Sequence, residues 1–475
     1  MVFASLIFLF LFLPLNLVLY YSSKNPVWRN WVLIAFSLFF YGWGEPIWIS
    51  LMILSSMVDW GNALFIEKHR GTKWAKVGVV VTLVFNLGLL ATFKYDRFIV
   101  DTVNSVLGTS FSAPGYALPI GISFYTFHTI SYVVDVYRGD IKAQRSFPNF
   151  LMYVSLYSSL VAGPIIRYAH VEHEIDKRNE NLKDFSLGLT RFCIGLFKKV
   201  VIANVAAELV KKYMGDNSDP LTMTELLSLS SLEAWVGLIM FAIQIYFDFS
   251  GYSDMAIGLG RMFGFHFREN FNYPYISRSI SEFWRRWHIS LGSIFRDYVY
   301  IPLGGNKKRV YFNLFIVWFL TGLWHGPSWN FIFWGLYFFV FIALEKAFLQ
   351  KWLDSIPAFF SHVYALAIII PGWVIFYFTD TTILIAYVEK LFSFSAGSNG
   401  NIDVINTLTA HLFWLIMAII LCMPVYNKVK EWFENGLRRP AYFELASVTM
   451  NVASIFVCVA QLVGKSYNPF IYFRF

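Results

Sequence analysis

The sequence predicts an all-α protein whose chain crosses a membrane many times. Of its 475 residues, 57% are hydrophobic and 14% are charged, whereas soluble domains carry about 25% charged residues. So few charges cannot cover a water-exposed surface, and lipid must therefore cover much of it. Aromatic residues make up 20% of the chain, which suits contact with acyl chains and headgroups. Together with a mean hydropathy of +0.54, these observations exclude a soluble protein.

Apolar runs of the length that crosses a bilayer, roughly 17–25 residues, recur along the whole chain. Several runs are short or interrupted by charge, which predicts half-helices or re-entrant segments whose backbone is shielded by protein or by a water-filled cavity. We expect about 11 transmembrane helices in a single domain, 1–475. The runs are 2–21, 31–43, 46–66, 75–94, 118–137, 186–211, 226–247, 310–323, 328–349, 358–379, 404–425 and 443–463.

The topology follows from the positive charges between these runs. The run 2–21 lacks a basic n-region and a small-residue cleavage site, so we interpret it as a retained first span. Lysine and arginine clusters follow the first, third and fifth runs. If those loops are cytoplasmic, the N-terminus and the loop 95–117 lie outside. The basic stretch 167–183 then requires 148–166 to be re-entrant on the cytoplasmic side, and a Gly-Pro helix breaker at 163–164 supports this.

The net charge of +8 belongs to these clusters, which set topology and touch anionic headgroups. We therefore expect a lipid bilayer as partner and no nucleic acid. The three cysteines are far apart and no His/Cys ligand spacing occurs, so we expect neither a disulfide framework nor a metal site. The sequence also lacks a phosphate-binding loop and a Gly-x-Ser-x-Gly nucleophile elbow.

The residue with the clearest chemical potential is His325, which lies between apolar runs with Gly322 and Gly326 beside it. Ionisable groups at membrane depth are costly and usually face a cavity or the bundle interior, and small glycines let a backbone or a substrate approach. A neutral imidazole there can accept a proton from a hydroxyl or carry an acyl group briefly. The alternative is a core histidine hydrogen-bonded between helices, and position alone gives the two interpretations similar weight.

A second cluster, 282–297, combines basic and aromatic residues. We expect it to be helical. Trp284 then precedes His288 by four residues and Arg285 precedes it by three, so both side chains lie beside His288 on the helix surface. With the basic loop 307–309, this helix can hold an anionic donor such as the phosphates of a coenzyme. The alternative, which the residue types alone favour, is an interfacial helix whose Trp and Arg side chains anchor in headgroups. The candidate donor-binding residues here are Arg285, Arg286 and Trp287.

Two acids, Asp248 and Asp254, stand at the end of a long apolar run. They are costly there unless solvated or paired, and the candidate partners are Arg285, Arg286 and Arg296. We expect a structural pair that holds a broken helix. The alternatives are a proton relay, ion coupling or contact with substrate.

Two further polar features interrupt apolar runs. His128 could line the same cavity as His325, although a packing role is favoured. The pair Lys198-Lys199 breaks the run 186–211 and predicts a helix that first lies along the cytoplasmic interface.

At these residues the sequence resembles the membrane-bound O-acyltransferase family, specifically its bacterial branch for alginate and polysaccharide O-acetylation. Several long motifs in the family's order make the resemblance specific, and it covers about 118–378. One departure is His128, where that branch is expected to have Gln, which leaves the exact subfamily open. The motifs are Leu118 to Phe127, Asp135 to Gly139, Leu160 to Pro164, Gly195 to Val200, Gln244 to Asp254, Asn270 to Tyr275, Ser281 to Ser290, Arg296 to Gly305 and Thr321 to Gly326.

The resemblance implies a mechanism and a setting. His325, in the Trp-His-Gly motif, is the expected catalytic residue, and Trp324 beside it is an expected substrate-binding residue. His288 belongs to a second signature and is expected to take part in catalysis by orienting the donor or relaying a proton. A ring of helices is expected around a funnel from outside and a tunnel from the cytoplasm. The donor is expected to be acetyl-CoA, with no bound cofactor, and the acceptor an exopolysaccharide reached directly or through an extracytoplasmic SGNH-type partner. The expected location is the bacterial cytoplasmic membrane.

Three alternatives stay open at this point. One is D-alanyl transfer to teichoic acid from a carrier protein. Another is a polysaccharide exporter or flippase, for which Asp248 and Asp254 are the only hint. The third is a scaffold without catalytic activity, in which the loop 95–117 would matter and His325 would not.

Overall fold

The computed structural model describes residues 1–475 except 162, 217, 398–400, 437–439, 465–469 and 471–475. Within these residues every element is a helix, apart from one isolated bridge between Gly215 and Pro220. By length and composition, six helices can cross a membrane, or seven if one bent pair forms a single span. The all-α, multi-pass class is therefore confirmed, and the number of about 11 spans stays a prediction.

The chain divides into two compact units. Of the described residues, the first unit contains those in 1–192 and 252–269, and the second contains those in 193–251 and 270–464 together with Phe470. Two helices, α10 and α13, contribute residues to both units. The elements that begin in the first unit are η1 (Phe8–Phe12), α1 (Leu13–Tyr21), α2 (Pro26–Gly42), α3 (Trp48–Lys68), α4 (Lys73–Phe93), α5 (Asp96–Leu107), α6 (Ile122–Arg138), α7 (Phe147–Ser155), α8 (Tyr157–Leu160), α9 (Tyr168–Asp176) and α10 (Leu182–Phe197).

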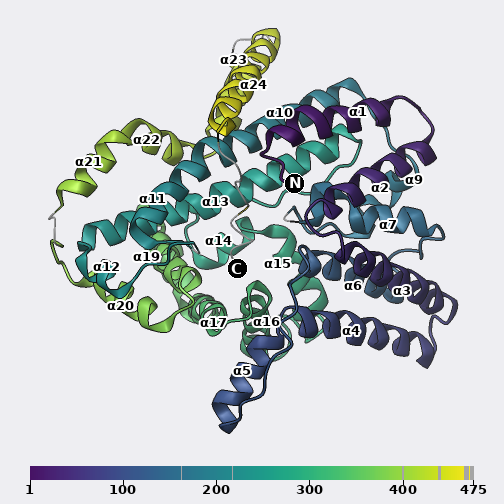
Figure 1. Ribbon diagram of the computed structural model, residues 1–475, viewed down its shortest axis with the longest axis horizontal. Helices are drawn as coiled ribbons and strands as arrows, with labels where there is room; N and C mark the ends of the chain where they lie inside the picture. The colour runs from purple at the N-terminus through teal and green to yellow at the C-terminus, as the bar shows by residue number, and fades with distance from the viewer. Residues whose placement is uncertain (162, 217, 398–400, 437–439, 465–469, 471–475) are drawn as a thin grey trace. The chain divides into compact units, whose positions relative to one another are not determined.

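The first unit has a polar network inside its helix bundle. The carboxyl group of Asp59, on α3, accepts hydrogen bonds from Thr82 Oγ1 at 3.1 Å and from Asn86 Nδ2 at 2.8 Å, both on α4. Thr129 on α6 donates to Asn86 Oδ1 at 3.3 Å. All four side chains are fully buried, and Figure 1 shows α3, α4 and α6 side by side. Because buried polar groups need partners, this network fixes how the three helices pack.

The remaining elements begin in the second unit. The elements are η2 (Lys198–Ala203), α11 (Asn204–Met214), α12 (Met223–Ser228), α13 (Ser231–Met262), η3 (Pro274–Ile276), α14 (Ile280–Arg286), α15 (Ile289–Phe295), η4 (Arg296–Tyr300), α16 (Val310–His325), α17 (Trp329–Leu344), η5 (Glu345–Leu349), α18 (Gln350–Ser355), α19 (Ala358–Tyr377), α20 (Thr381–Phe392), α21 (Ile402–Ala410), α22 (Leu412–Leu421), α23 (Val425–Gly436) and α24 (Pro440–Leu462).

Helices α16 and α17 lie side by side in Figure 1, and their backbones approach closely at two glycines. An ideal Cβ on Gly322 of α16 would lie 2.3 Å from the carbonyl oxygen of Phe331, on α17. An ideal Cβ on Gly335 of α17 would lie 2.3 Å from the carbonyl oxygen of Trp318, on α16. Small residues allow helices in membranes to approach this closely. The glycine beside the candidate histidine therefore admits a neighbouring backbone, which is one of the two options expected from the sequence.

Several helices differ in length or shape from the predicted runs, since α6 is shorter than its run, α2 and α16 are longer than theirs, and one run is bent. The predicted spans 31–43, 118–137 and 310–323 form α2, α6 and α16, with 17, 17 and 16 residues. The run 404–425 forms α21 and α22, bent by 66°. The segment 148–166 forms α7 and α8 and then leaves the helical conformation, and its path in a bilayer stays a prediction.

Candidate active site

His325 is the last residue of α16 and is 6% exposed. The helix ends there because Pro327 follows two residues later, and the residue before a proline is pushed out of the helical conformation. Gly326 accordingly adopts an extended backbone with φ −167° and ψ 159°. The sequence thus places an imidazole at the end of an apolar helix, where the chain turns toward α17.

Three aromatic rings from three helices surround the imidazole of His325. Its centroid lies 5.1 Å from that of Trp324, 4.9 Å from that of Trp334 and 5.3 Å from that of Phe376. All three contacts are edge-to-face, with interplanar angles of 73°, 84° and 82°. Such contacts are the favoured geometry for ring pairs. The helices α16, α17 and α19 therefore fix the plane of the ring.

His288 does not lie on the helix that the sequence predicts. Helix α14 ends at Arg286, and His288 adopts a left-handed conformation with φ 44° and ψ 53° before α15 begins. The prediction of one helix through 282–297 is wrong because Asn270 binds the start of α15. Its carbonyl oxygen accepts a hydrogen bond from Ile289 N at 2.9 Å, and its Oδ1 accepts one from Ser290 N at 3.1 Å. A non-glycine residue in this conformation is uncommon and often functional.

The tautomer of His288 follows from the same asparagine. Oδ1 of Asn270 accepts from the backbone N–H and the hydroxyl of Ser290, at 3.1 and 2.8 Å, so it must be the amide oxygen. His288 Nδ1 lies 3.2 Å from that oxygen and therefore carries the hydrogen. The lone pair is then on Nε2, for which the described residues provide no hydrogen-bond partner. Burial lowers the pKa of His288 to about 3, so the ring is a neutral base at physiological pH.

Trp324 connects the two histidines. Its ring lies 6.0 Å from that of His288 and 5.1 Å from that of His325. His288 also packs edge-on against Phe249, at 4.6 Å. The second unit thus brings together His325, His288 and Trp324, three residues that the sequence singles out. They form one buried cluster.

The candidate donor-binding residues have different environments. Arg285 is exposed. Arg286 pairs with Glu282, with Nη2 2.8 Å from Oε1, and donates to the Asn272 carbonyl. Trp287 is 3% exposed and packs against the rings of Phe271 and Trp373 at 5.1 and 5.0 Å. The structure therefore gives Trp287 a place in the core, and contact of these residues with a donor stays a prediction.

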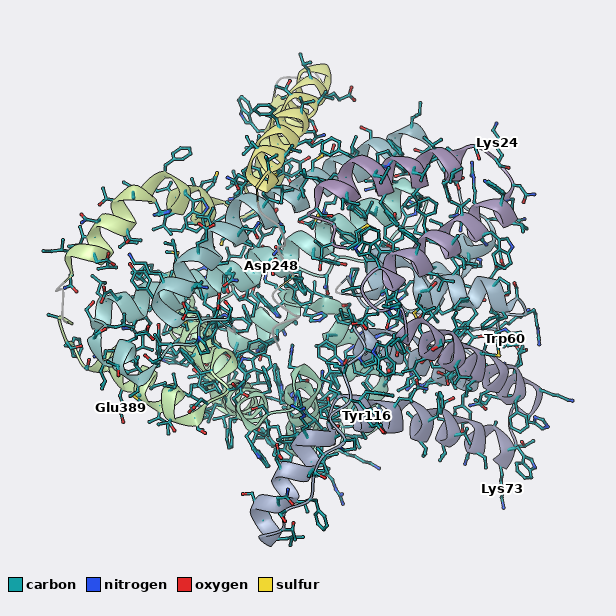
Figure 2. The ribbon with its side chains drawn as sticks, in the orientation of Figure 1. Lys24, Trp60, Lys73, Tyr116, Asp248 and Glu389 are labelled. Atoms are coloured by element: carbon teal, nitrogen blue, oxygen red, sulfur yellow. The ribbon has the colours of Figure 1, made fainter. Side chains whose placement is uncertain are left out.

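Asp248, labelled in Figure 2, pairs with Lys199, whose Nζ lies 2.6 Å from Oδ1. Both side chains are buried. The predicted arginine partners are wrong for this acid. Lys199 is the partner because it belongs to η2, a stretch of π-helix that interrupts the otherwise helical segment 182–214. Lys199 is thus held inside the bundle by Asp248, and the prediction of a helix that first lies along the cytoplasmic interface stays a prediction.

Asp254, in the first unit, pairs with Arg191 at 2.6 Å. Arg191 also binds Glu269, so the predicted arginine partners are wrong here too. Helix α13 is continuous through both acids, and the predicted broken helix is absent because each carboxyl group has a nearby cation within the bundle. Paired charges of this kind need no break in the helix to reach solvent.

His128 has the packing role that the sequence favours. It is fully buried in the first unit, and its Nε2 accepts a hydrogen bond from Ile166 N at 3.2 Å. Its ring also packs against that of Tyr153 at 5.6 Å.

Sequence reasoning missed Asn270, Trp334, Phe376 and Lys199 as parts of these environments. Asn270 begins the motif Asn270 to Tyr275, but its contact with α15 is long-range and leaves no local signal in the sequence. Trp334 is one of 17 tryptophans and Phe376 one of 50 phenylalanines, so composition does not distinguish them. Among the residues that the structure describes, no group of three or more His, Cys, Asp or Glu side chains could hold a metal ion.

Comparison with known proteins agrees with this geometry. The sequence profile of the membrane-bound O-acyltransferase family matches residues 126–388. A probable alginate O-acetylase of Azotobacter vinelandii is 36% identical over 518 aligned residues, which cover 100% of both chains. A peptidoglycan O-acetyltransferase of Helicobacter pylori is 33% identical, covering 79% of this chain and 77% of the relative. A teichoic acid D-alanyltransferase of Bacillus subtilis is 30% identical, covering 49% and 60%. The chain therefore belongs to the membrane-bound O-acyltransferase family and is a multi-pass membrane acyltransferase.

Proposed function

We propose that this protein transfers an acetyl group from cytoplasmic acetyl-CoA, across the membrane, to hydroxyls of an extracytoplasmic polysaccharide. The observation that carries the proposal is the cluster of His325, Trp324 and His288, which holds two imidazoles against one indole inside an apolar bundle. The alginate and peptidoglycan O-acetyltransferases among the relatives support the choice of acetyl group and acceptor.

In this proposal His325 acts on the reacting hydroxyl. The acceptor oxygen attacks the thioester carbonyl carbon while His325 takes its proton, the C–S bond breaks, and the thiolate receives that proton as the thiol leaves. General bases of this kind contribute about 10²–10⁴-fold in rate. If the acyl group is first transferred to His325, the same changes occur in two steps. The thiol leaves in the first step, and the acceptor hydroxyl loses its proton as it takes the acyl group in the second.

His288 is proposed to orient the donor or to relay the proton. Its Nδ1–H is held by Asn270, so its basic nitrogen, Nε2, has one fixed direction. A preset tautomer lowers the reorganisation needed during proton transfer, as oriented histidines do in other acyl transferases. Arg285, exposed next to this turn, is the proposed contact for donor phosphates.

The proposed setting is the bacterial cytoplasmic membrane. Acetyl-CoA is cytoplasmic and the polymer lies outside, so an integral protein must connect the two compartments. An extracytoplasmic SGNH-type transferase is the proposed partner that completes transfer to the polymer. The relatives named for polymer acetylation support this setting.

The test uses purified full-length protein, its proposed extracytoplasmic transferase partner, radiolabelled acetyl-CoA and a polysaccharide acceptor. Wild-type protein is expected to move label to the polymer, and His325→Ala is expected to lose at least about 100-fold of the rate. His411→Ala is the matched control, because His411 is a half-buried histidine of the same unit whose Nδ1 contacts the Thr407 carbonyl at 2.9 Å. Wild-type rates in His325→Ala, with the protein folded, would contradict the assignment.

D-alanyl transfer is the second candidate, favoured by the Bacillus subtilis relative. A competition between acetyl-CoA and a D-alanyl carrier-protein thioester separates the two donors. An exporter would instead move polymer in liposomes without any acyl donor, and a scaffold would be insensitive to His325→Ala.

A further inference from the structure

A buried carboxyl group lies in the second unit outside the histidine cluster. Glu345 begins η5, the π-helical stretch that continues α17, and is 1% exposed. A carboxyl group inside an apolar bundle is costly unless it is paired or hydrogen-bonded. Its partners in the described part of the chain are three neutral donors, the backbone N–H groups of Ile280 and Ser281 and the hydroxyl of Tyr364. The donors come from α14 and α19, so this one side chain joins three helices.

Both oxygens of this carboxyl group bind the start of α14. Oε1 accepts a hydrogen bond from Ile280 N at 2.6 Å, and Oε2 accepts one from Ser281 N at 2.8 Å. The hydroxyl of Tyr364 donates to Oε1 at 3.2 Å and helps to orient the group. The first N–H groups of a helix have no partner within the helix. Glu345 therefore supplies partners for two N–H groups that α14 itself cannot satisfy.

The next two N–H groups of α14 are satisfied locally. Ser279 Oγ accepts from Glu282 N at 3.1 Å, and the Ser279 carbonyl accepts from Phe283 N at 3.0 Å. These contacts come from the residue just before α14, so they stabilise the helix without fixing where it lies among its neighbours. Glu345 comes from 65 positions later than Ile280. Its contact is the one that ties the start of α14 to another helix.

The other end of α14 leads directly into the turn of His288. The helix ends at Arg286, whose carbonyl accepts from Asn272 N at 2.9 Å and whose Nη1 donates to the Asn272 carbonyl at 3.1 Å. His288 follows two residues later and is held by Asn270. With seven residues, α14 is about 10 Å long at 1.5 Å per residue. So short a helix moves as one body, and a shift at Ile280 is carried to His288.

The side of α14 touches the surroundings of His325. Trp284 packs edge-on against Trp334 at 5.3 Å and against Phe338 at 4.9 Å, both on α17. Trp334 in turn packs against His325 at 4.9 Å. Because Glu345 lies on the continuation of α17, the same long helix contacts α14 at its start and along its side. Two separated contacts fix the orientation of α14, which one contact alone would leave free to pivot.

We propose that Glu345 is a positioning residue for acyl transfer, which holds His288 in place through α14. The inference rests on the proposed function, in which His288 orients the donor or relays the proton. Without the carboxyl group, α14 shifts to find other partners for its first N–H groups. The ring of His288 then leaves the direction that Asn270 gives to it. A misplacement of about 1 Å can cost about 10²-fold in rate.

The experiment measures kcat for acetyl transfer by the full-length protein with its proposed transferase partner, labelled acetyl-CoA and a polysaccharide. Glu345→Ala is expected to lower kcat about 100-fold. Glu345→Gln keeps one acceptor oxygen at the same reach, so its loss should be smaller, about 10-fold; it also serves if Glu345→Ala does not fold.

A double-mutant cycle with His288→Gln separates positioning from general stability. In the His288→Gln background, Glu345→Ala and Glu345→Gln should each change kcat by less than about twofold, because a residue that acts through His288 has nothing left to position. Equal fold losses in the two backgrounds overturn the proposal, since a residue that only stabilises the fold acts independently of His288.

Spectroscopy tests the same inference without acetyl transfer. In ¹⁵N NMR of histidine-labelled protein, His288 should show one tautomer in the wild type and both tautomers in Glu345→Ala. Glu233→Ala is the matched control, because Glu233 is a buried second-unit residue whose Oε2 accepts from Ser230 N at 2.7 Å at the start of α13. This control should lower Tm and leave kcat within about twofold, with one His288 tautomer. A single tautomer in Glu345→Ala, or the same mixture in Glu233→Ala, overturns the proposal.

The two proposals fail in different ways. If the wild-type protein transfers no acetyl group to the polymer, the proposed function is overturned, and the tautomer of His288 in Glu345→Ala still decides whether Glu345 positions that residue. Polymer acetylation by Glu345→Ala within about twofold of the wild-type kcat overturns the role of Glu345 and leaves the proposed function standing.

Discussion

Replacing Gly322 by alanine tests whether helix packing sets the geometry of the active site. The added Cβ would lie 2.3 Å from the carbonyl oxygen of Phe331 and 3.1 Å from Ile332 Cα. Both are backbone atoms of α17, so no side-chain rotation relieves the contact. The two helices must move apart locally by about 1 Å to reach ordinary contact distance.

The displacement acts directly on the imidazole of His325. His325 follows Gly322 by three residues on α16, and Trp334 follows Phe331 by three residues on α17, so both lie within one turn of the contact. The ring distance of 4.9 Å between His325 and Trp334 would increase. Overpacking of a core costs about 1–3 kcal/mol, and a misplacement of 1 Å can cost about 10²-fold in rate.

The assay measures kcat/KM for acetyl transfer and the Tm of each variant in detergent. Gly322→Ala is expected to lose about 100-fold in kcat/KM and to lower Tm. Gly88→Ala is the matched control, since a Cβ on this helical glycine of α4 meets nothing within 4 Å. Wild-type activity and Tm in Gly322→Ala would refute the reasoning that the close approach of α16 and α17 positions His325.

Three further predictions follow from the contacts of the second unit. Asn270→Ala removes the oxygen that binds Ser290 and His288, so we expect the unfolding free energy to fall by about 1–3 kcal/mol. We also expect His288 to populate both tautomers, which ¹⁵N NMR would detect. A single unchanged tautomer would contradict this. Lys199→Met removes the cation 2.6 Å from Asp248 and should lower the unfolding free energy by about 3–5 kcal/mol. The double variant Lys199→Met/Asp248→Leu should regain most of that free energy, because no buried charge is left unpaired. Equal losses in the single and double variants would refute the pairing. Because the pKa of His288 is lowered to about 3 and that of an unfolded histidine is about 6.5, the unfolded state binds one more proton between these values. Stability should therefore fall as the pH drops below about 6.5, and the slope should be shallower in His288→Gln; identical slopes would contradict a neutral buried His288.

The sequence predicted the elements of the fold well where a local rule decides them. Apolar runs become helices because lipid offers no hydrogen bonds to the backbone, and the break after His325 follows from Pro327. His325, Trp324 and His288 were chosen from motifs and a family resemblance, and the structure places all three in one cluster.

The failures share a physical cause, which is contact over long separation. Asn270 contacts His288 from 18 positions earlier and Ser290 from 20 positions earlier, so no helical spacing rule could reveal the turn. Lys199 pairs with Asp248 from 49 positions away because a π-helical stretch turns it inward. The predicted ends of the helices differ from the observed ends by a few residues, because helices end where such contacts and caps arise.

The most direct measurement of the central claim is transfer across a sealed membrane. The protein would be oriented in proteoliposomes with labelled acetyl-CoA on the cytoplasmic side only and a polysaccharide, with its transferase partner if required, on the other side. The account predicts that label reaches the polymer in wild-type vesicles, and that His325→Ala slows this by at least about 100-fold with an unchanged Tm. Transfer at the wild-type rate by folded His325→Ala would contradict the account.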